Sequence, residues 1–80
     1  MDPQTISLVD LPVKSIAKII DINGGIGFQE KLDVMGIRVG KTVTVVSKQP
    51  FHGPLTIKVC STKMTLGRGM ARKILVEVVS

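Results

Sequence analysis

The sequence predicts a mainly β fold: a small closed barrel of about five short strands, with one short helix between the first two strands. Val and Ile together number 20 against 6 Leu, and 6 Thr raise the β-branched total to 26, a composition that favours strands over helices. Short alternating apolar runs are separated by turns rich in Gly and Pro, as in small all-β proteins. At 80 residues the chain is expected to form one domain, residues 1–80. Closure of its sheet would remove the exposed edges that invite association.

The N-terminal region is expected to supply an anchoring segment and the first strand. Leu8 and Leu11 are available to fix the first residues on the core. Residues 17–22 alternate loosely, with Ile20 and Ile22 on one face, and end at an Asn-Gly-Gly turn signal,. This run is the first predicted strand.

A short helix is predicted after that turn. Phe28, Leu32 and Met35 follow at i, i+4 and i+7, the spacing of one helix face. The helix should end at Gly36, because glycine readily adopts the left-handed conformation that follows a helix. Ile37 is placed to make the apolar contact that accompanies such an end.

The second half of the chain reads as a series of strands joined by turns. A loop over 48–54 contains two prolines and a glycine, so it should be longer than a two-residue hairpin turn. A single helical turn fits residues 69–72, after a Gly-Arg-Gly break,. The remaining strands are expected at residues 42–47, 55–60, 63–66 and 74–79.

Charge is distributed unevenly along the chain. Residues 1–40 carry four Lys/Arg and five Asp/Glu, whereas residues 41–80 carry seven and one. A basic half can attract an acidic partner, anionic lipid headgroups or phosphates, or it can simply be a solvated face. The cations are spread along strands and turns, and Phe28 and Phe51 are the only aromatic rings. Nucleic-acid binding is therefore not expected, because stacking platforms for bases need more rings.

The sequence offers little for catalysis or for a structural metal. His52 and Cys60 are the only imidazole and thiol. Structural zinc needs four ligands, typically with a paired spacing such as C-x-x-C. Glu30 and Asp33, three residues apart, fit the exposed face of the predicted helix. We expect no enzymatic activity, no catalytic residue and no cofactor. Weak binding of a divalent transition metal by His52 at a subunit contact stays open.

We expect a cytoplasmic protein. No apolar run approaches the roughly 18 to 20 residues that span a bilayer, and the N-terminal residues lack the basic-then-apolar order of a signal peptide,. A single cysteine forms no internal disulfide, which suits a reducing compartment.

The order of motifs resembles the FeoA family of ferrous iron transport proteins over nearly the whole chain. The most specific part is L-x-x-M-G-I-x-x-G, residues 32–40, followed by P-x-x-G-P, residues 50–54. The resemblance also uses L-x-x-L at 8–11, the strand and turn at 19–25, V-x-V at 43–45, I-x-V at 57–59, and Leu66 with A-x-x-I-x-V at 71–76. Two positions depart from the family pattern: Lys31 replaces a frequent Arg, and Met70 replaces a frequent acid.

This resemblance implies an SH3-like barrel without catalysis that serves ferrous iron uptake. The implied partner is the cytosolic part of a membrane transporter that carries a GTPase domain, so any membrane association would be indirect. Small barrels of this kind bind through loops at one side, which here gives the predicted partner-binding residues Pro50, Phe51, His52, Arg68, Met70 and Arg72. Phe51 is either a contact residue or a lid over the end of the barrel. The scarcity of rings favours the lid.

Two other functions are kept as alternatives. The first is a metal-responsive module in which His52, with a carboxylate of a neighbouring copy, takes a divalent transition metal; a homo-oligomer would then form the site. The second, weaker alternative is a small nucleic-acid binder, based on the fold and on the basic second half.

Overall fold

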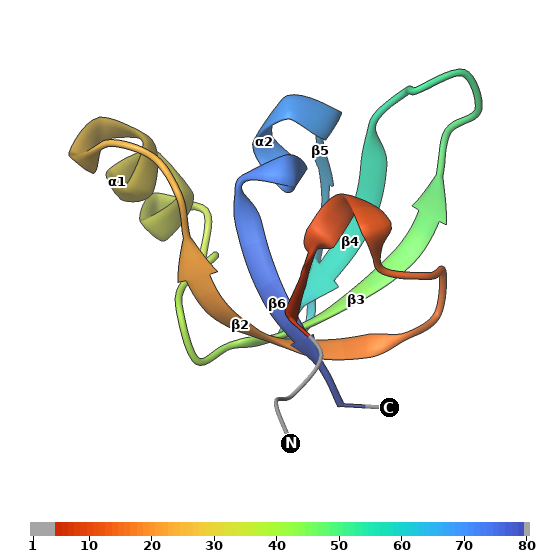
Figure 1. Cartoon of the computed structure of the whole chain (residues 1–80), viewed down its shortest axis with the longest axis horizontal. Coiled ribbons are helices and arrows are strands. Elements are labelled where there is room, and N and C mark those ends of the chain that lie inside the picture. Colours follow the sequence, from red (N-terminus) through yellow and green to blue (C-terminus); the bar gives the residue numbers. More distant parts are fainter. Residues whose placement is uncertain (1–4, 80) are drawn as a thin grey trace.

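The computed structural model describes residues 5–79, which form six strands, two α-helices and a short 3-10 helix (Figure 1). In chain order the elements are β1 (Thr5–Ser7), η1 (Leu8–Asp10), β2 (Ile16–Ile22), α1 (Ile26–Val34), β3 (Thr42–Lys48), β4 (Leu55–Val59), β5 (Thr62–Leu66), α2 (Arg68–Arg72) and β6 (Ile74–Val78). The predicted class is confirmed: the fold is mainly β, and α1 lies between the first two strands that the sequence indicated.

The strands form one antiparallel sheet in the order β1-β6-β2-β3-β4-β5. Two details differ from the prediction. The sheet has a sixth strand, β1, which is only three residues long and shows no alternation that a sequence pattern could reveal. Within residues 5–79, strand pairing does not join β1 to β5, so the cylinder that we expected is not closed by backbone ladders.

The gap between the two edge strands is bridged by helical segments instead. η1 packs against α2, and the Ser7 hydroxyl donates hydrogen bonds to the carbonyl oxygens of Arg72 (2.9 Å) and Ala71 (3.3 Å). These contacts close the gap at one end, where α2 follows β5.

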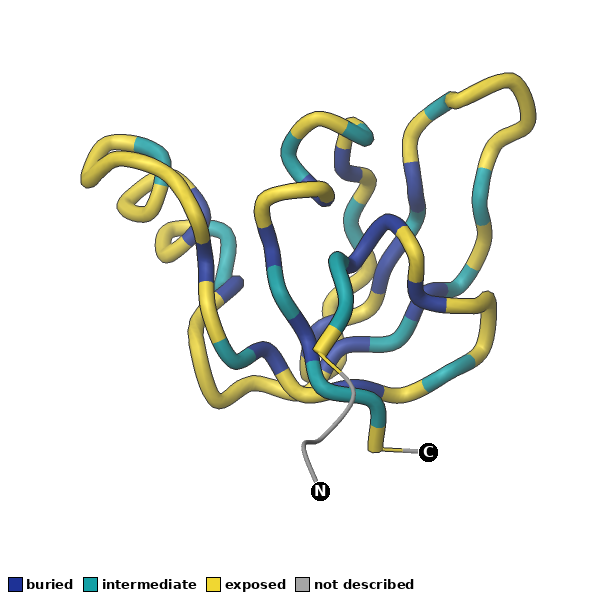
Figure 2. Tube along the Cα trace, viewed as in Figure 1, coloured by how far each residue is buried: buried dark blue, intermediate teal, exposed yellow. Residues whose placement is uncertain are grey.

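The core fills the space inside the curled sheet (Figure 2). Leu8 and Leu11 are fully buried, which confirms their predicted role as anchors. The strands contribute Ala17, Ile19, Ile22, Val43, Val45, Leu55, Ile57, Val59, Leu66, Ile74 and Val76, and the connecting segments contribute Val9, Leu32, Ile37 and Ala71. Among the described residues, the core contains no polar or charged side chain.

An irregularity in β2 changes which of its residues face the core. The register of β2 against β6 shifts between Ile19 and Asp21, which is the signature of a β-bulge. The extra residue, Ile20, is only half-buried, whereas Ile19 and Ile22 are buried. The expectation that Ile20 and Ile22 share a face was therefore wrong, because alternation restarts after a bulge.

The C-terminal end of α1 has the geometry that its sequence predicted. Gly36 has a φ of 91°; its N–H donates to the carbonyl of Asp33 at 2.9 Å, and the N–H of Ile37 donates to that of Leu32 at 2.9 Å. This pair of bonds is the Schellman arrangement. It directs Ile37, which is 1% exposed, into the core beside Leu32.

Candidate functional site

The tip of the hairpin between β3 and β4 is a tight turn with an unusual sequence. The N–H of Gly53 donates to the carbonyl of Pro50 at 3.2 Å, and Phe51 and His52 have φ values of 59° and 62°. Positive φ at both central positions defines a type I′ turn, which normally carries Asn-Gly. A Cβ on Gly53 would lie 2.5 Å from the Gln49 Cβ, a clash that favours glycine as the last residue of the turn.

Phe51 and His52 are held in a conformation that disfavours both side chains. Left-handed backbone is uncommon for residues other than Gly, Asn and Asp, and a bulky residue there is strained. The Phe51 side chain gains no burial in return, because the residue is 96% exposed. The expectation that Phe51 acts as a lid over the barrel was therefore wrong, because its ring is exposed to solvent. The hairpin that joins β3 and β4 projects from the sheet (Figure 1).

The predicted partner-binding residues leave the sheet from the same end. Lys48 pairs with Leu55, and Leu55 pairs with Leu66. The hairpin loop, which follows Lys48, and α2, which follows Leu66, therefore start from neighbouring positions, and both lie at the upper end of the molecule in Figure 1. We call the residues Pro50, Phe51, His52, Arg68, Met70 and Arg72 the loop–helix surface.

The α2 part of this surface is basic and partly apolar. Arg68 and Met70 are half-buried, Met70 packs against the core, and Arg72 is exposed. In the part of the chain that the structure describes, the ion pair is between Arg38 and Asp33, so neither arginine of α2 is neutralised by a carboxylate. An acidic or polar partner surface with an apolar spot for Phe51 would complement this end of the molecule.

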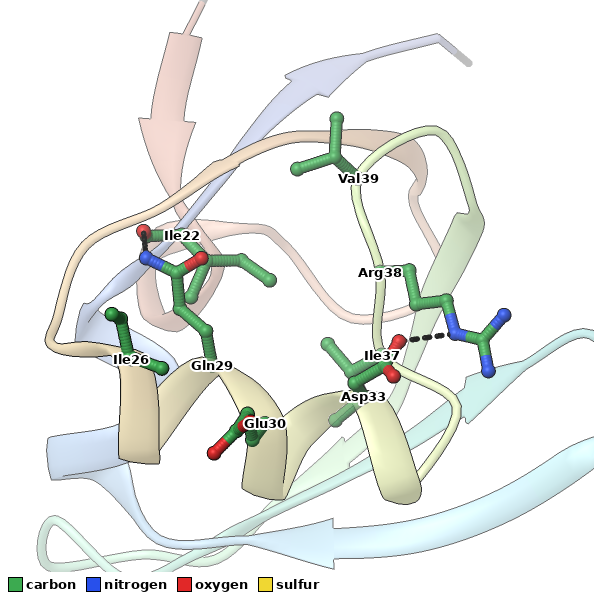
Figure 3. Close-up of a pocket in the computed structure, with 8 residues that line it drawn as sticks. All are labelled: Ile22, Ile26, Gln29, Glu30, Asp33, Ile37, Arg38 and Val39. Carbon is green, nitrogen blue, oxygen red and sulfur yellow. Dashed lines mark hydrogen bonds and ion pairs between the residues drawn. The ribbon is translucent and has the colours of Figure 1, made fainter.

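A pocket lies beside α1, away from the loop–helix surface (Figure 3). It is a pocket of about 320 Å3 lined by Ile22, Ile26, Gln29, Glu30, Asp33, Ile37, Arg38 and Val39. The Gln29 side-chain amide donates to the carbonyls of Ile22 (3.3 Å) and Gly24 (3.1 Å). This pocket was not predicted from the sequence, in which Glu30 and Asp33 were interpreted only as the exposed face of the predicted helix. Ile26 and Val39 could have indicated the pocket, because these apolar residues lie outside the predicted core face. In the structure they are 79% and 60% exposed.

The reactive side chains of the described residues do not gather into a metal centre within one copy. Residues 5–79 contain no group of three or more His, Cys, Asp and Glu side chains that could hold a metal ion. His52 precedes β4 and Cys60 follows it, and a strand rises about 3.3 Å per residue. The imidazole and the thiol therefore lie at opposite ends of the strand, too far apart to ligate one ion or to form one catalytic pair.

Within the described part of the chain, every helix is too short, or too polar, to cross a bilayer.

Comparisons with known proteins agree on one family. The model of the FeoA domain matches residues 6–78. A protein of Methanocaldococcus jannaschii whose name includes the words Fe(2+) transport protein A is 38% identical over 56 residues, which are 70% of this chain and 66% of the relative. The match thus spans slightly less than two thirds of that relative's length.

Solved structures show the same fold. A crystal structure of an iron uptake regulatory protein (FeoA) superimposes with a TM-score of 0.88 at 26% identity and covers 95% of this chain and 100% of that one. A FeoA-like protein from Clostridium acetobutylicum gives 0.86 at 29% identity and covers 100% of this chain and 92% of that one. A manganese-dependent transcriptional repressor gives 0.88 at 18% identity, covering 99% of this chain and 44% of that one, which shows the shared SH3-like fold.

Proposed function

The chain belongs to the FeoA domain family, and from this premise we propose that it is a non-catalytic adaptor in ferrous iron uptake. Its proposed partner is the cytosolic part of a ferrous iron transporter that carries a GTPase domain. The module itself would reside in the cytoplasm and reach the membrane only through that transporter. The name of the M. jannaschii relative and the FeoA structures support a role in Fe(2+) transport.

The observation that carries the proposal is the strained and exposed hairpin tip. A protein gains no stability from an aromatic ring that is 96% exposed on left-handed backbone. Strained residues persist where function requires their geometry, and buried aromatic anchors dominate the energetics of protein interfaces. Phe51 is therefore proposed as the anchor of the loop–helix surface, and Arg68 and Arg72 as the charged contacts at its side.

The proposal is tested by titrating the cytosolic domain of the cognate transporter with the wild-type protein and with Phe51→Asn. Asn tolerates the left-handed conformation, so the variant keeps the turn. Loss of an anchor should weaken binding at least about tenfold. Val34→Asn is the matched control because Val34 is also an exposed apolar residue, 87% exposed, on the surface of α1.

The titration is repeated with GDP, with a GTP analogue and with Fe2+. Absence of binding in every condition would remove the adaptor proposal. Equal weakening by Phe51→Asn and Val34→Asn would leave an adaptor but would exclude the loop–helix surface as its contact.

Direct metal binding at His52 is proposed only as a property of an assembly. His52 is exposed at the hairpin tip, and one imidazole binds a metal weakly unless a second copy supplies further ligands. Calorimetry with Fe2+ under anaerobic conditions decides this for the wild type and His52→Ala. Equal heats for the two proteins would exclude His52 as a ligand.

A further inference from the structure

The edge of β5 that points away from β4 has free backbone groups. β5 is the last strand in the sheet order, and Val59 pairs with Thr62 across the two-residue turn at Cys60 and Ser61. A pair that flanks a two-residue turn is hydrogen-bonded. By alternation, the N–H and C=O groups of Lys63 and Thr65 are directed outward. Within residues 5–79 these groups have no hydrogen-bond partner.

Two lysines lie side by side on β4 and on the edge strand β5. Lys58 of β4 is directly opposite Lys63 of β5, and both are exposed. Strands β3, β4 and β5 carry no Asp or Glu, so no neighbour in these strands offsets the repulsion. Like charges directly opposite on paired strands destabilise a sheet, which leaves an unmatched positive site beside the free backbone groups.

Protection of the edge against aggregation explains Lys63 but not Lys58. A lysine on an edge strand commonly prevents edge-to-edge association, and Lys63 suffices for that role. Lys58 lies on β4, between β3 and β5, where it protects no edge. Pairing with a second copy through the same edge is also disfavoured, because it would bring Lys58 and Lys63 of both copies together.

We propose that the free edge of β5 binds an extended acidic segment of a partner protein as an added strand. The backbone of that segment would bond to the outward groups of Lys63 and Thr65. A carboxylate of that segment opposite Lys63 would extend the cross-strand row of Lys58 and Lys63 and offset their positive charge. This site is separate from the loop–helix surface and does not depend on which partner that surface binds.

The test uses the complete protein and a blocked peptide, Thr-Val-Glu-Val-Glu-Val-Thr, as the probe. Amide hydrogen exchange is followed by NMR with and without the peptide at millimolar concentration. The amides of Lys63 and Thr65 should exchange rapidly in the free protein and at least about tenfold more slowly with the peptide. The amides of Thr62 and Met64, which face β4, serve as the internal reference.

Matched variants and peptides separate strand addition from general charge attraction. Lys63→Glu should weaken peptide binding about tenfold, because an attractive cross-strand pair becomes repulsive. Lys31→Glu, on α1, changes the net charge equally and should leave binding unchanged. Thr65→Pro removes one outward N–H without changing charge or a bond to β4, and should also weaken binding.

A peptide N-methylated at both Glu residues keeps the charge but loses the backbone donors that face β5 when a Glu lies opposite Lys63 in an antiparallel added strand. Slower exchange of the Lys63 and Thr65 amides, together with selectivity for the unmethylated peptide, supports the proposal. Three results overturn it: equal binding of both peptides, unchanged exchange of these amides at millimolar peptide, or protection of the edge by self-association in the absence of peptide.

Discussion

At the scale of single residues, the backbone conformation of the hairpin tip disfavours the two side chains that it exposes to solvent. Phe51 and His52 occupy turn positions that normally select Asn and Gly,. The sequence predicted a loop over residues 48–54, but it could not predict the turn type, because nothing in Pro-Phe-His-Gly indicates two consecutive left-handed residues. Phe51 was accordingly placed over the core by composition, although a ring on this turn projects into solvent.

Replacing the tip by the residues that its backbone prefers should separate stability from binding. We expect the double variant Phe51→Asn, His52→Gly to increase the free energy of unfolding by about 1 kcal/mol, because the strain of two side chains is relieved. It should also lose affinity for the transporter domain. Urea denaturation followed by circular dichroism measures the first effect, and the titration described above measures the second.

Cys60 provides the matched control for that experiment. It has a φ of 59° in the turn between β4 and β5, at the other end of β4 from the tip. Cys60→Gly should stabilise the fold by about 0.5–1 kcal/mol for the same conformational reason and leave transporter binding unchanged. A loss of binding in Cys60→Gly would mean that turn strain, rather than the side chains at the tip, affects the partner.

At the scale of elements, local sequence signals predicted the helix better than the strand before it. The end of α1 followed from Gly36 and Ile37, because a Schellman cap is formed by residues adjacent in sequence. Ile19 and Ile22 are both buried because β2 has a bulge at Ile20. The bulge arises from pairing with β6, in which Asp21 lies opposite Leu75, 54 residues later in the chain. Pairing between distant strands leaves no trace in a local pattern.

Two glycines near the start of α1 should respond oppositely to alanine. Gly24 has a φ of 143°, and a Cβ there would lie 2.6 Å from the Phe28 ring, so Gly24→Ala should lower the free energy of unfolding by about 1–2 kcal/mol. Gly27 lies inside the helix with open space around its Cβ position, so Gly27→Ala should raise it by about 0.5–1 kcal/mol. Thermal and urea unfolding of both variants measure the two signs. Destabilisation of Gly27→Ala would contradict the helical environment assigned to that residue.

At the scale of the whole molecule, the sheet curls around one core as predicted, but strand pairing does not close it, and η1 and α2 join its two edges at one end. Alternating Val, Ile and Leu residues were sufficient to predict a curled sheet around one core. The seam between β1 and β5 was unpredictable, because it depends on the packing of η1 on α2 and on the Ser7 hydroxyl. The loop–helix surface was predicted residue by residue, whereas its assembly at one end of the sheet required the pairing of Lys48, Leu55 and Leu66.

The seam should be sensitive to one hydroxyl group. Ser7→Ala removes the donor to the carbonyls of Ala71 and Arg72 and should lower the free energy of unfolding by about 1 kcal/mol. It should also accelerate amide exchange in β1. Ser47→Ala, at an exposed position of β3, is the control with little expected effect. Equal losses in the two variants would show that the hydroxyl of Ser7 does not hold the seam.

The ends of the described chain lie together, away from the hairpin tip. Thr5, near the start of the described chain, pairs with Glu77, near its end. Val78 lies in a cross-strand row with Ala17, Val43 and Val59. Val59 is the last residue of β4, at the end opposite the hairpin tip. Both ends accordingly emerge at the lower side of the molecule in Figure 1. Affinity handles, fluorophores or a solid support attached at either terminus would leave Phe51 accessible, so immobilised protein can be used to capture its partner without masking the tip.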